Sequence, residues 1–264
     1  MGHFAVLMYH RIESPRCPVA AADERPWSVT RDRFSAQLDR IAADGGKGVS
    51  MHQVHEHLAS GKTVPPGWVA ITFDDGNESD VEHALPMLAE RGFRATFFVC
   101  GERIDVAGGL STTMLRELHA SGMHIGSHAI THRFLTTLSA DDENVELRGS
   151  RERLESIVGA TVDHFAPPGG RWSARTREGL RRLGYRAVST SRFGYNDASR
   201  PAFAYRRLPV VRSTADGRFD AMIRGDRVRL VSGYTRDRTL GWARALLGEG
   251  AYARGRAART GKHA

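Results

Sequence analysis

Short apolar runs and amphipathic stretches alternate along this chain. The apolar runs are typical of buried strands; they are residues 4–10, 68–73, 94–99, 124–128, 162–166 and 185–190. The stretches between them carry apolar residues at helical spacing and predict helices; these are residues 30–46, 79–92, 111–122, 140–158 and 173–184. Strands that alternate with helices in this way predict an α/β fold, with a parallel sheet or barrel inside and helices outside.

The predicted helices have recognisable starts, breaks and apolar faces. Thr30 and Ser79 are expected to cap the first two helices, and Pro86 is expected to kink the second. The apolar positions of the first and the longest helix are expected to face the core; they are Phe34, Leu38 and Ile41, then Val145, Leu147, Leu154 and Ile157.

The composition is that of a soluble globular protein. The 264 residues fit one large α/β domain, with 41% hydrophobic and 26% charged residues. No apolar run approaches the about 20 residues that span a bilayer, and the N-terminus is interpreted as a first strand, not a signal peptide. Cys17 and Cys100 are too far apart to indicate a disulfide framework or zinc knuckle. Free thiols in a reducing compartment, and hence a cytoplasmic protein, are expected.

The formal net charge of +8 is concentrated partly near the C-terminus. Residues 226–264 are expected to form an Arg-rich helix or tail outside the domain, and residues 241–264 hold five Lys or Arg against the single acid Glu249. Such a tail could attract nucleic acid, anionic lipid or an acidic glycan, or it could be a solvated terminus. No nucleic-acid-binding signature accompanies the charge, so no nucleic acid partner is expected.

Two adjacent carboxylates follow the apolar run of residues 68–73. The segment reads Thr-Phe-Asp-Asp-Gly, so that Asp74 and Asp75 end the predicted strand before Gly76. Adjacent residues of a strand point to opposite faces, and a carboxylate that faces the interior needs a partner or a metal. The alternative is a solvated turn, because Asp and Gly are ordinary turn residues.

Two histidines follow a later strand, in the segment GSHAITH. His128 and His132 are four residues apart and could share a metal ion on a helical turn or tight loop, with an aspartate of the TFDDG segment as third ligand. Functional groups of such folds gather at the C-terminal ends of strands. TFDDG, GSHAITH and FAPPGG each lie at such an end. Coincidence is the alternative for the two histidines in a chain with 12 His. The nearby His52, His55 and His57 are expected on a solvated helix without a function.

These segments resemble the motifs of the polysaccharide deacetylases of the NodB-homology type, carbohydrate esterase family 4. The first family motif, T-F-D-D-G, is intact, and the second, H-[ST]-x-x-H, is present with Ala129 in the Ser or Thr position. The third, R-x-P-[YF]-G, is altered, since FAPPGG has Ala166 for the Arg and Gly169 for the aromatic residue. The resemblance covers roughly residues 4–212 and implies a single-domain distorted (β/α) barrel within residues 1–225.

The histidine of the family's last motif is absent from its usual place, because only His263 follows His164. A subgroup that acts on exopolysaccharides, including the poly-N-acetylglucosamine deacetylases, carries this histidine in an N-terminal "YH" strand end and can lack the third-motif Arg. With its segment LMYHRI the chain resembles that subgroup, which assigns the histidine to His10; a packing role is the alternative. Arg207 is expected either to orient Asp74 in place of the missing Arg or to be an ordinary surface residue.

The resemblance also implies what each residue does. Three residues would bind a divalent metal ion, for which Zn²⁺ is expected: Asp75, His128 and His132. Asp74 would act as general base toward the water that the ion activates, and His10 would protonate the leaving amine. The segment around Pro168 would provide the oxyanion donor, the backbone N–H of Gly169.

The expected activity is removal of N-acetyl groups from GlcNAc-type sugars of an exopolysaccharide or its oligosaccharide precursor. The enzyme would be cytoplasmic, with its basic tail in weak contact with the anionic inner face of the membrane. Two alternatives remain. A glycan-binding pseudoenzyme fits the altered third motif but not the retained aspartates and histidines. A non-haem metal oxygenase fits two His and a carboxylate, but such proteins are usually all-β.

Overall fold

The computed structural model describes residues 3–13 and 24–227. Residues 1–225 form one compact unit. Cys17 and the basic tail lie outside the described residues, so the expectations about them stay predictions. Cys100 is a buried free thiol, and burial raises its pKa to about 12.

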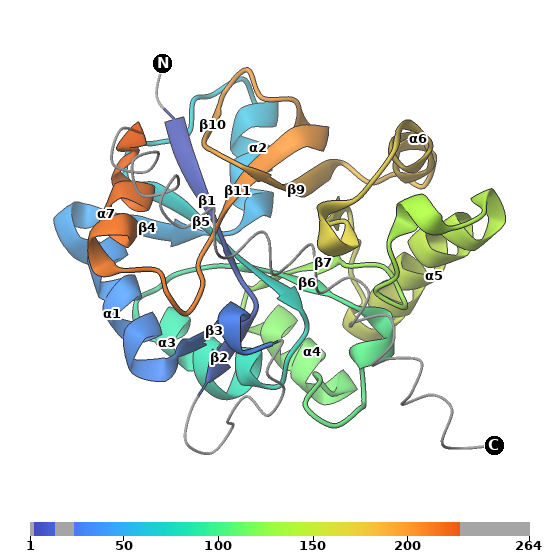
Figure 1. Ribbon diagram of the computed structural model, residues 1–264, viewed down its shortest axis with the longest axis horizontal. Helices are drawn as coiled ribbons and strands as arrows, with labels where there is room; N and C mark the ends of the chain where they lie inside the picture. Colours follow the sequence, from blue (N-terminus) through green and yellow to red (C-terminus); the bar gives the residue numbers. More distant parts are fainter. Residues whose placement is uncertain (1–2, 14–23, 228–264) are drawn as a thin grey trace. The chain divides into compact units, whose positions relative to one another are not determined.

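Seven parallel strands close into a barrel (Figure 1). Neighbouring strands follow the order β1-β11-β9-β8-β7-β6-β5, and the barrel closes because β5 also pairs with β1 along Ala5–Tyr9 and Val69–Phe73. The barrel strands are β1 (His3–Tyr9), β5 (Trp68–Asp75), β6 (Thr96–Val99), β7 (His124–Ser127), β8 (His164–Phe165), β9 (Ala187–Phe193) and β11 (Tyr205–Pro209). The expected α/β barrel is therefore confirmed.

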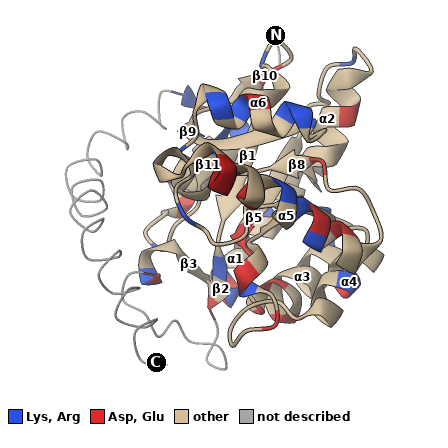
Figure 2. Cartoon of the chain, turned by 90° about the vertical axis from the view of Figure 1, so that its right-hand side faces the viewer, with Lys and Arg blue, Asp and Glu red and all other residues tan. Residues whose placement is uncertain are grey.

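Shorter strands and the helices surround the barrel. The additional strands are β2 (Arg11–Glu13), β3 (Ser28–Thr30), β4 (Lys47–Val49) and β10 (Asn196–Asp197). The helices are α1 (Arg31–Ala42), α2 (Met51–Ala59), α3 (Leu85–Glu90), α4 (Thr112–Ala120), α5 (Ala140–Val158), α6 (Ala174–Arg182) and α7 (Asp216–Arg224). Charged residues of both signs line α5, and α6 carries Arg residues (Figure 2). No helix in the described part of the chain is long and apolar enough to cross a membrane.

Strand alternation separates Asp74 from the apolar layer. Phe73 points outward, where its ring packs on Phe34 of α1 at 5.7 Å between centroids. Asp74, the next residue of β5, is buried and points to the opposite side, into the barrel. The same alternation applies to Tyr9, which packs on Phe34, and to His10, which follows it. The apolar layer thereby fixes which polar groups meet at the end of the barrel.

Several local expectations from the sequence need correction. Thr30 and Ser111 cap their helices as the pattern predicts, but the Ser79 hydroxyl makes no capping bond and instead accepts from the N–H of Ile12. The helix around Pro86 is a π-helical turn, Asp80–Ala84, continued by α3, so the interruption precedes the proline. Val145 of α5 is 61% exposed and does not join the core.

Candidate active site

Asp75, His128 and His132 meet at the C-terminal ends of β5 and β7. The Oδ1 atom of Asp75 lies 3.6 Å from Nε2 of His128 and 3.3 Å from Nε2 of His132. One potential ligand atom from each residue falls within 4.8 Å of the others. His128 is buried, whereas His132 and Asp75 are partly exposed, so the group is open on one side.

The donor atoms of this group suit a divalent metal ion. His128 Nδ1 lies 2.7 Å from the carbonyl oxygen of Ala166. A proton on Nδ1 donated to that carbonyl leaves the Nε2 lone pair facing Asp75. Oδ1 of Asp75 is buried and has no hydrogen-bond partner within the described residues. Two imidazoles and one carboxylate with open positions fit Zn²⁺ and related ions.

The end of β5 and the loop that carries the two histidines share an unusual backbone conformation. Asp75, Ala129 and His132 all have positive φ, at 84°, 63° and 59°. Such values are uncommon for residues other than glycine and persist only where the surroundings enforce them. Here Glu146 of α5 accepts hydrogen bonds from the backbone N–H groups of Ile130 and Thr131, at 2.8 and 2.9 Å. The loop geometry is thus fixed from a neighbouring helix.

Asp74 makes a buried, two-point ion pair with Arg207 of β11. The Nη1–Oδ1 and Nη2–Oδ2 distances are 2.6 and 2.7 Å. Arg207 is completely buried, and its Nε donates to the carbonyl oxygen of Thr190 at 3.1 Å. A bidentate arginine fixes both the position and the plane of a carboxylate. The alternative that Arg207 is a surface residue is therefore wrong.

The electrostatic environment favours the forms needed for metal binding. Burial would raise the pKa of both Asp74 and Asp75, but hydrogen bonds and charge interactions with neighbouring side chains outweigh it, so that both values lie below the usual range. For Asp74 the dominant opposing group is Arg207, and for Asp75 it is His132. Burial lowers the pKa of His128 to about 4. Both carboxyl groups are therefore ionised and His128 is neutral near pH 7.

His10 lies at the C-terminal end of β1, beside β5. Its imidazole is near enough to both Asp74 and Asp75 to lower their pKa values. Nδ1 of His10 is buried without a hydrogen-bond partner in the described structure, and the ring lies 4.8 Å from the partly exposed Trp27. The amide of Asn77, just after the first motif, donates to the His10 carbonyl at 2.9 Å. His10 and the two aspartates therefore belong to one rim of the barrel.

The third motif forms a tight turn directly after β8. Pro168 is buried, and Gly169 has a φ of 59°. A Cβ atom on Gly169 would lie only 2.4 Å from Cε1 of Phe134. The ring of Phe134, from the loop after the second motif, therefore occupies the space beside Gly169, and the Arg171 guanidinium lies 4.4 Å from that ring.

Two contributors to the site escaped the sequence reasoning. The carbonyl of Ala166 contacts His128, although only the missing side chain at this position attracted attention. Glu146 holds the histidine loop, and the only sequence signal was an acidic residue on the apolar face of a predicted helix. The three histidines assigned to a solvated helix also differ from expectation. His55 is buried, and His52 is partly buried close to His124 and His164.

The sequence matches the model of the polysaccharide deacetylase family over residues 61–188. It is 25% identical over 218 residues to the putative polysaccharide deacetylase YxkH of Bacillus subtilis, covering 83% of this chain and 75% of that protein. It is 32% identical over 127 residues to a chitin deacetylase of Colletotrichum lindemuthianum, covering 48% of this chain. The chain spans about half the length of that chitin deacetylase, 51%.

Solved structures share the fold. The Streptococcus pyogenes deacetylase PplD has a TM-score of 0.76 at 23% identity, covering 84% of this chain and 98% of PplD. IcaB from Ammonifex degensii has a TM-score of 0.69 at 25% identity, covering 84% of this chain and 97% of IcaB. With the first two motifs meeting at one rim of the barrel, these similarities lead to one conclusion. The chain contains a polysaccharide deacetylase domain of the NodB-homology type.

Proposed function

We propose that this protein is a metal-dependent hydrolase that removes N-acetyl groups from an N-acetylated oligo- or polysaccharide. The proposal rests on two groups of residues that lie at the same rim of the barrel. One is the open donor set of Asp75, His128 and His132, and the other is the buried pair of Asp74 and Arg207. Metal-assisted amide hydrolysis needs both an ion site with open positions and a carboxylate that does not serve as ligand.

The three donors would hold the ion, with Zn²⁺ as the expected species. The ion would supply a Lewis acid that acidifies a water molecule and polarises the acetamide carbonyl. The charge of Asp75 is needed for binding, and the neutral form of His128 leaves its Nε2 lone pair available.

Asp74 would accept the proton of the attacking water. Its two contacts with Arg207 keep the carboxylate ionised and hold its plane fixed, so little reorganisation precedes proton transfer. Arg207 would in this way replace the arginine that Ala166 lacks. The missing side chain is supplied from β11 instead of the third motif.

His10 would donate a proton to the leaving amine. It reaches the rim from β1, beside β5, and its unpartnered Nδ1 leaves it free of a competing hydrogen bond within the described residues. The backbone N–H of Gly169, following Pro168, would donate to the oxyanion, because the turn after β8 adjoins the carbonyl that contacts His128. The assignment of His10 follows the permuted subgroup of the family.

The substrate is proposed from chemistry shared by the relatives. Chitin deacetylase and the peptidoglycan-N-acetylmuramic acid deacetylase PdaC of Bacillus subtilis, which is 30% identical over 148 residues, are both named for acetylated amino sugars. We infer a GlcNAc-type exopolysaccharide or its precursor as substrate. Action in the cytoplasm, at the inner face of the membrane, is a further part of the proposal that cell fractionation tests.

The experiment compares two variants that separate metal binding from proton transfer. Asp74→Asn should keep bound metal and lower acetate release from N-acetylated oligosaccharides by about a hundred- to ten-thousand-fold, the usual contribution of a positioned base. His132→Ala should lose both the metal and the activity. Metal analysis, melting temperature and acetate release are measured on the same samples.

His10→Ala supplies the third arm. If His10 is the general acid, the His10→Ala protein should keep its bound metal. Its turnover should fall by about a hundred- to ten-thousand-fold, as for Asp74→Asn. A His10→Ala protein that is folded, metallated and fully active would remove His10 from the mechanism. A wild-type protein that binds the oligosaccharide and metal but releases no acetate would identify a glycan-binding pseudoenzyme.

A further inference from the structure

A second cluster of metal-ligating side chains lies at the opposite rim of the barrel. His124 is the first residue of β7 and His164 the first of β8, whereas the residues of the first two motifs lie at or just after the C-terminal ends of β5 and β7. Because the barrel strands are parallel, these two histidines belong to the N-terminal rim. Asp163 precedes β8, and His52 comes from the first turn of α2.

The contacts within this cluster converge on one carboxylate. Oδ1 of Asp163 lies 2.6 Å from Nδ1 of His164 and 3.6 Å from Nε2 of His124. The rings of His52 and His124 stack at 5.0 Å between centroids. Potential ligand atoms from all four residues lie within 4.8 Å of one another.

Two buried imidazole nitrogens in the cluster lack a hydrogen-bond partner among the described residues, and a bound ligand would supply one. Nε2 of His164 and Nδ1 of His52 are buried and have no partner among the described residues. The His164 side chain is only 1% exposed. Buried polar atoms are normally paired, so unpaired nitrogens on adjacent histidines call for an explanation.

We propose that His52, His124, Asp163 and His164 bind a second divalent transition-metal ion, with Zn²⁺ as the ion that this ligand set suits. Three imidazoles and one carboxylate complete a tetrahedral shell, unlike the three-ligand group at the other rim. The second site therefore stabilises the barrel's N-terminal rim, where it ties α2 to the strands β7 and β8.

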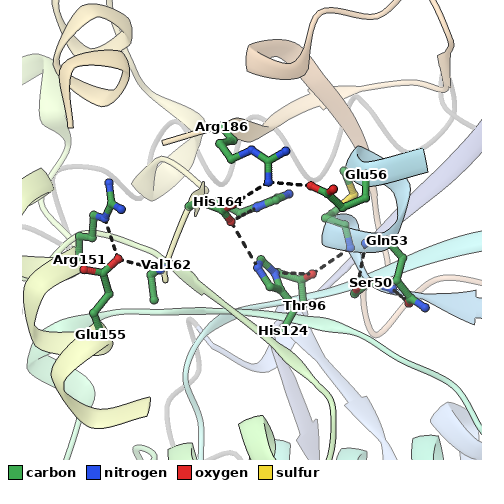
Figure 3. A network of polar contacts seen from close by, with 12 residues as sticks. Ser50, Gln53, Glu56, Thr96, His124, Arg151, Glu155, Val162, His164 and Arg186 are labelled. Atoms are coloured by element: carbon green, nitrogen blue, oxygen red, sulfur yellow. Dashed lines mark hydrogen bonds and ion pairs between the residues drawn. The ribbon is translucent and has the colours of Figure 1, made fainter. Parts of the chain in front are cut away.

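Neighbouring groups orient the ligands. Thr96 Oγ1 lies 3.3 Å from Nδ1 of His124, so a proton on Nδ1 can be donated to the hydroxyl, which leaves Nε2 free toward Asp163. Arg186 is 3.4 Å from Oδ2 of Asp163, the oxygen turned away from His164, and its charge is balanced by Glu56 at 2.6 Å (Figure 3). The carboxylate oxygen of Asp163 that faces the histidines is therefore Oδ1.

An ion can reach the cluster from solvent. A cleft of about 610 Å³ is lined in part by His52, His124 and Asp163. Both His52 and His124 are partly exposed, whereas His164 forms the buried floor. The site is therefore accessible without opening of the barrel.

The test uses the full-length, untagged chain carrying Asp75→Asn and His132→Ala, which dismantles the other ligand group. After removal of metal, equilibrium dialysis against Zn²⁺ should load about one ion per chain, as expected for a closed four-ligand site. Adding His52→Gln should weaken Zn²⁺ binding by at least about ten-fold. Co²⁺ should give the absorption spectrum of a tetrahedral site, and that spectrum should vanish with His52→Gln.

His57→Gln is the matched control, since His57 lies on the same helix with its ring against Trp68 and outside the cluster. Zn²⁺ should raise the melting temperature of this control but not that of the His52→Gln protein, which also verifies that both fold. The proposal is overturned if the starting chain binds no stoichiometric Zn²⁺, or if the His52→Gln and His57→Gln proteins bind it equally. Neither result bears on deacetylation.

Discussion

Asp74 and Arg207 bring opposite charges into the interior of the barrel. Their side chains are 4% and 0% exposed. Burying two charges is compensated only when their geometry is good and their remaining atoms are paired, and the contacts of Arg207 with Asp74, Thr190 and Thr72 meet that condition. The two-point contact holds the Asp74 carboxylate in one orientation.

We expect Arg207→Met to destabilise the protein by about 3–5 kcal/mol, because it leaves Asp74 charged and unpaired in the interior. Arg207→Lys keeps the charge but loses the bidentate contact. It should therefore retain the metal and lose turnover. Urea unfolding, metal analysis and acetate release distinguish the two effects.

The control for this prediction is the double variant Asp74→Asn with Arg207→Met, which removes both charges of the pair. It should be more stable than Arg207→Met alone, though inactive. If the single and double variants were equally stable, the unpaired charge of Asp74 would not be the cause of the loss of stability.

At the scale of elements, the turn after β8 depends on a glycine for two reasons. Gly169 has a φ of 59°, and a Cβ there would meet the ring of Phe134. Gly159, which ends α5, has a similar φ of 68° but open space around it. The two positions therefore separate backbone strain from steric contact.

We expect Gly169→Ala to destabilise the protein by about 1–2 kcal/mol more than Gly159→Ala, because only the former adds overpacking to the strain of positive φ. Combining Gly169→Ala with Phe134→Ala should remove this additional cost. Thermal or chemical unfolding of the variants provides the comparison. Equal losses of stability at the two glycines would show that the Phe134 ring moves aside without a measurable free-energy cost.

The π-helical turn after the first motif contains a buried acid. Burial raises the pKa of Asp80 well above its usual range, and the charge of Asp75 raises it further. The N–H of Asn77, which donates to Asp80, and the cations Arg103 and Arg11 act in the opposite direction. A folded-state pKa that is raised contributes stability at low pH, and this contribution is lost as pH rises through that pKa.

We therefore expect Asp80→Asn to flatten the pH dependence of stability. Relative to the variant, the wild type should lose up to about 1.4 kcal/mol per pH unit between about pH 4 and the raised pKa of Asp80. Denaturant unfolding is measured on metal-free protein, because an ion at Asp75 would offset that charge. Parallel stability curves for the two proteins would refute the assignment.

The sequence predicts the elements and the motif residues better than the contacts between them. Periodicity is enough to locate α5 at residues 140–158 and the strand that ends in Asp75. It misses β11, because the alternating YRRLP segment hides a buried Arg207, and it misses the role of the Ala166 carbonyl, which carries no side-chain signal. Contacts such as Glu146 with the histidine loop depend on three-dimensional proximity that spacing does not encode.

At the scale of the whole molecule, the two rims of the barrel carry different groups of side chains. The C-terminal rim carries strained backbone, an open three-ligand group and the buried ion pair. The N-terminal rim carries four residues that could hold a metal ion, backed by Thr96 and Arg186. Parallel strands make this division natural, because their C-terminal ends lead into loops that are free to vary while their N-terminal ends close the fold.

The basic segment beyond the barrel, outside the described residues, supports a last prediction. Because residues 1–225 form one compact unit, a chain ending at Arg227 should keep its melting temperature within a few degrees, its metal and its acetate release from soluble oligosaccharides. Its affinity for anionic vesicles should fall at least about ten-fold, because each basic residue near such a surface contributes about 1 kcal/mol. Neutral vesicles and added salt are the controls, since the attraction is screened within about 8 Å at physiological ionic strength. Unchanged, salt-sensitive vesicle binding by the shortened chain would assign the attraction to the barrel, and a collapse of its melting temperature would place residues 228–264 in the folded domain.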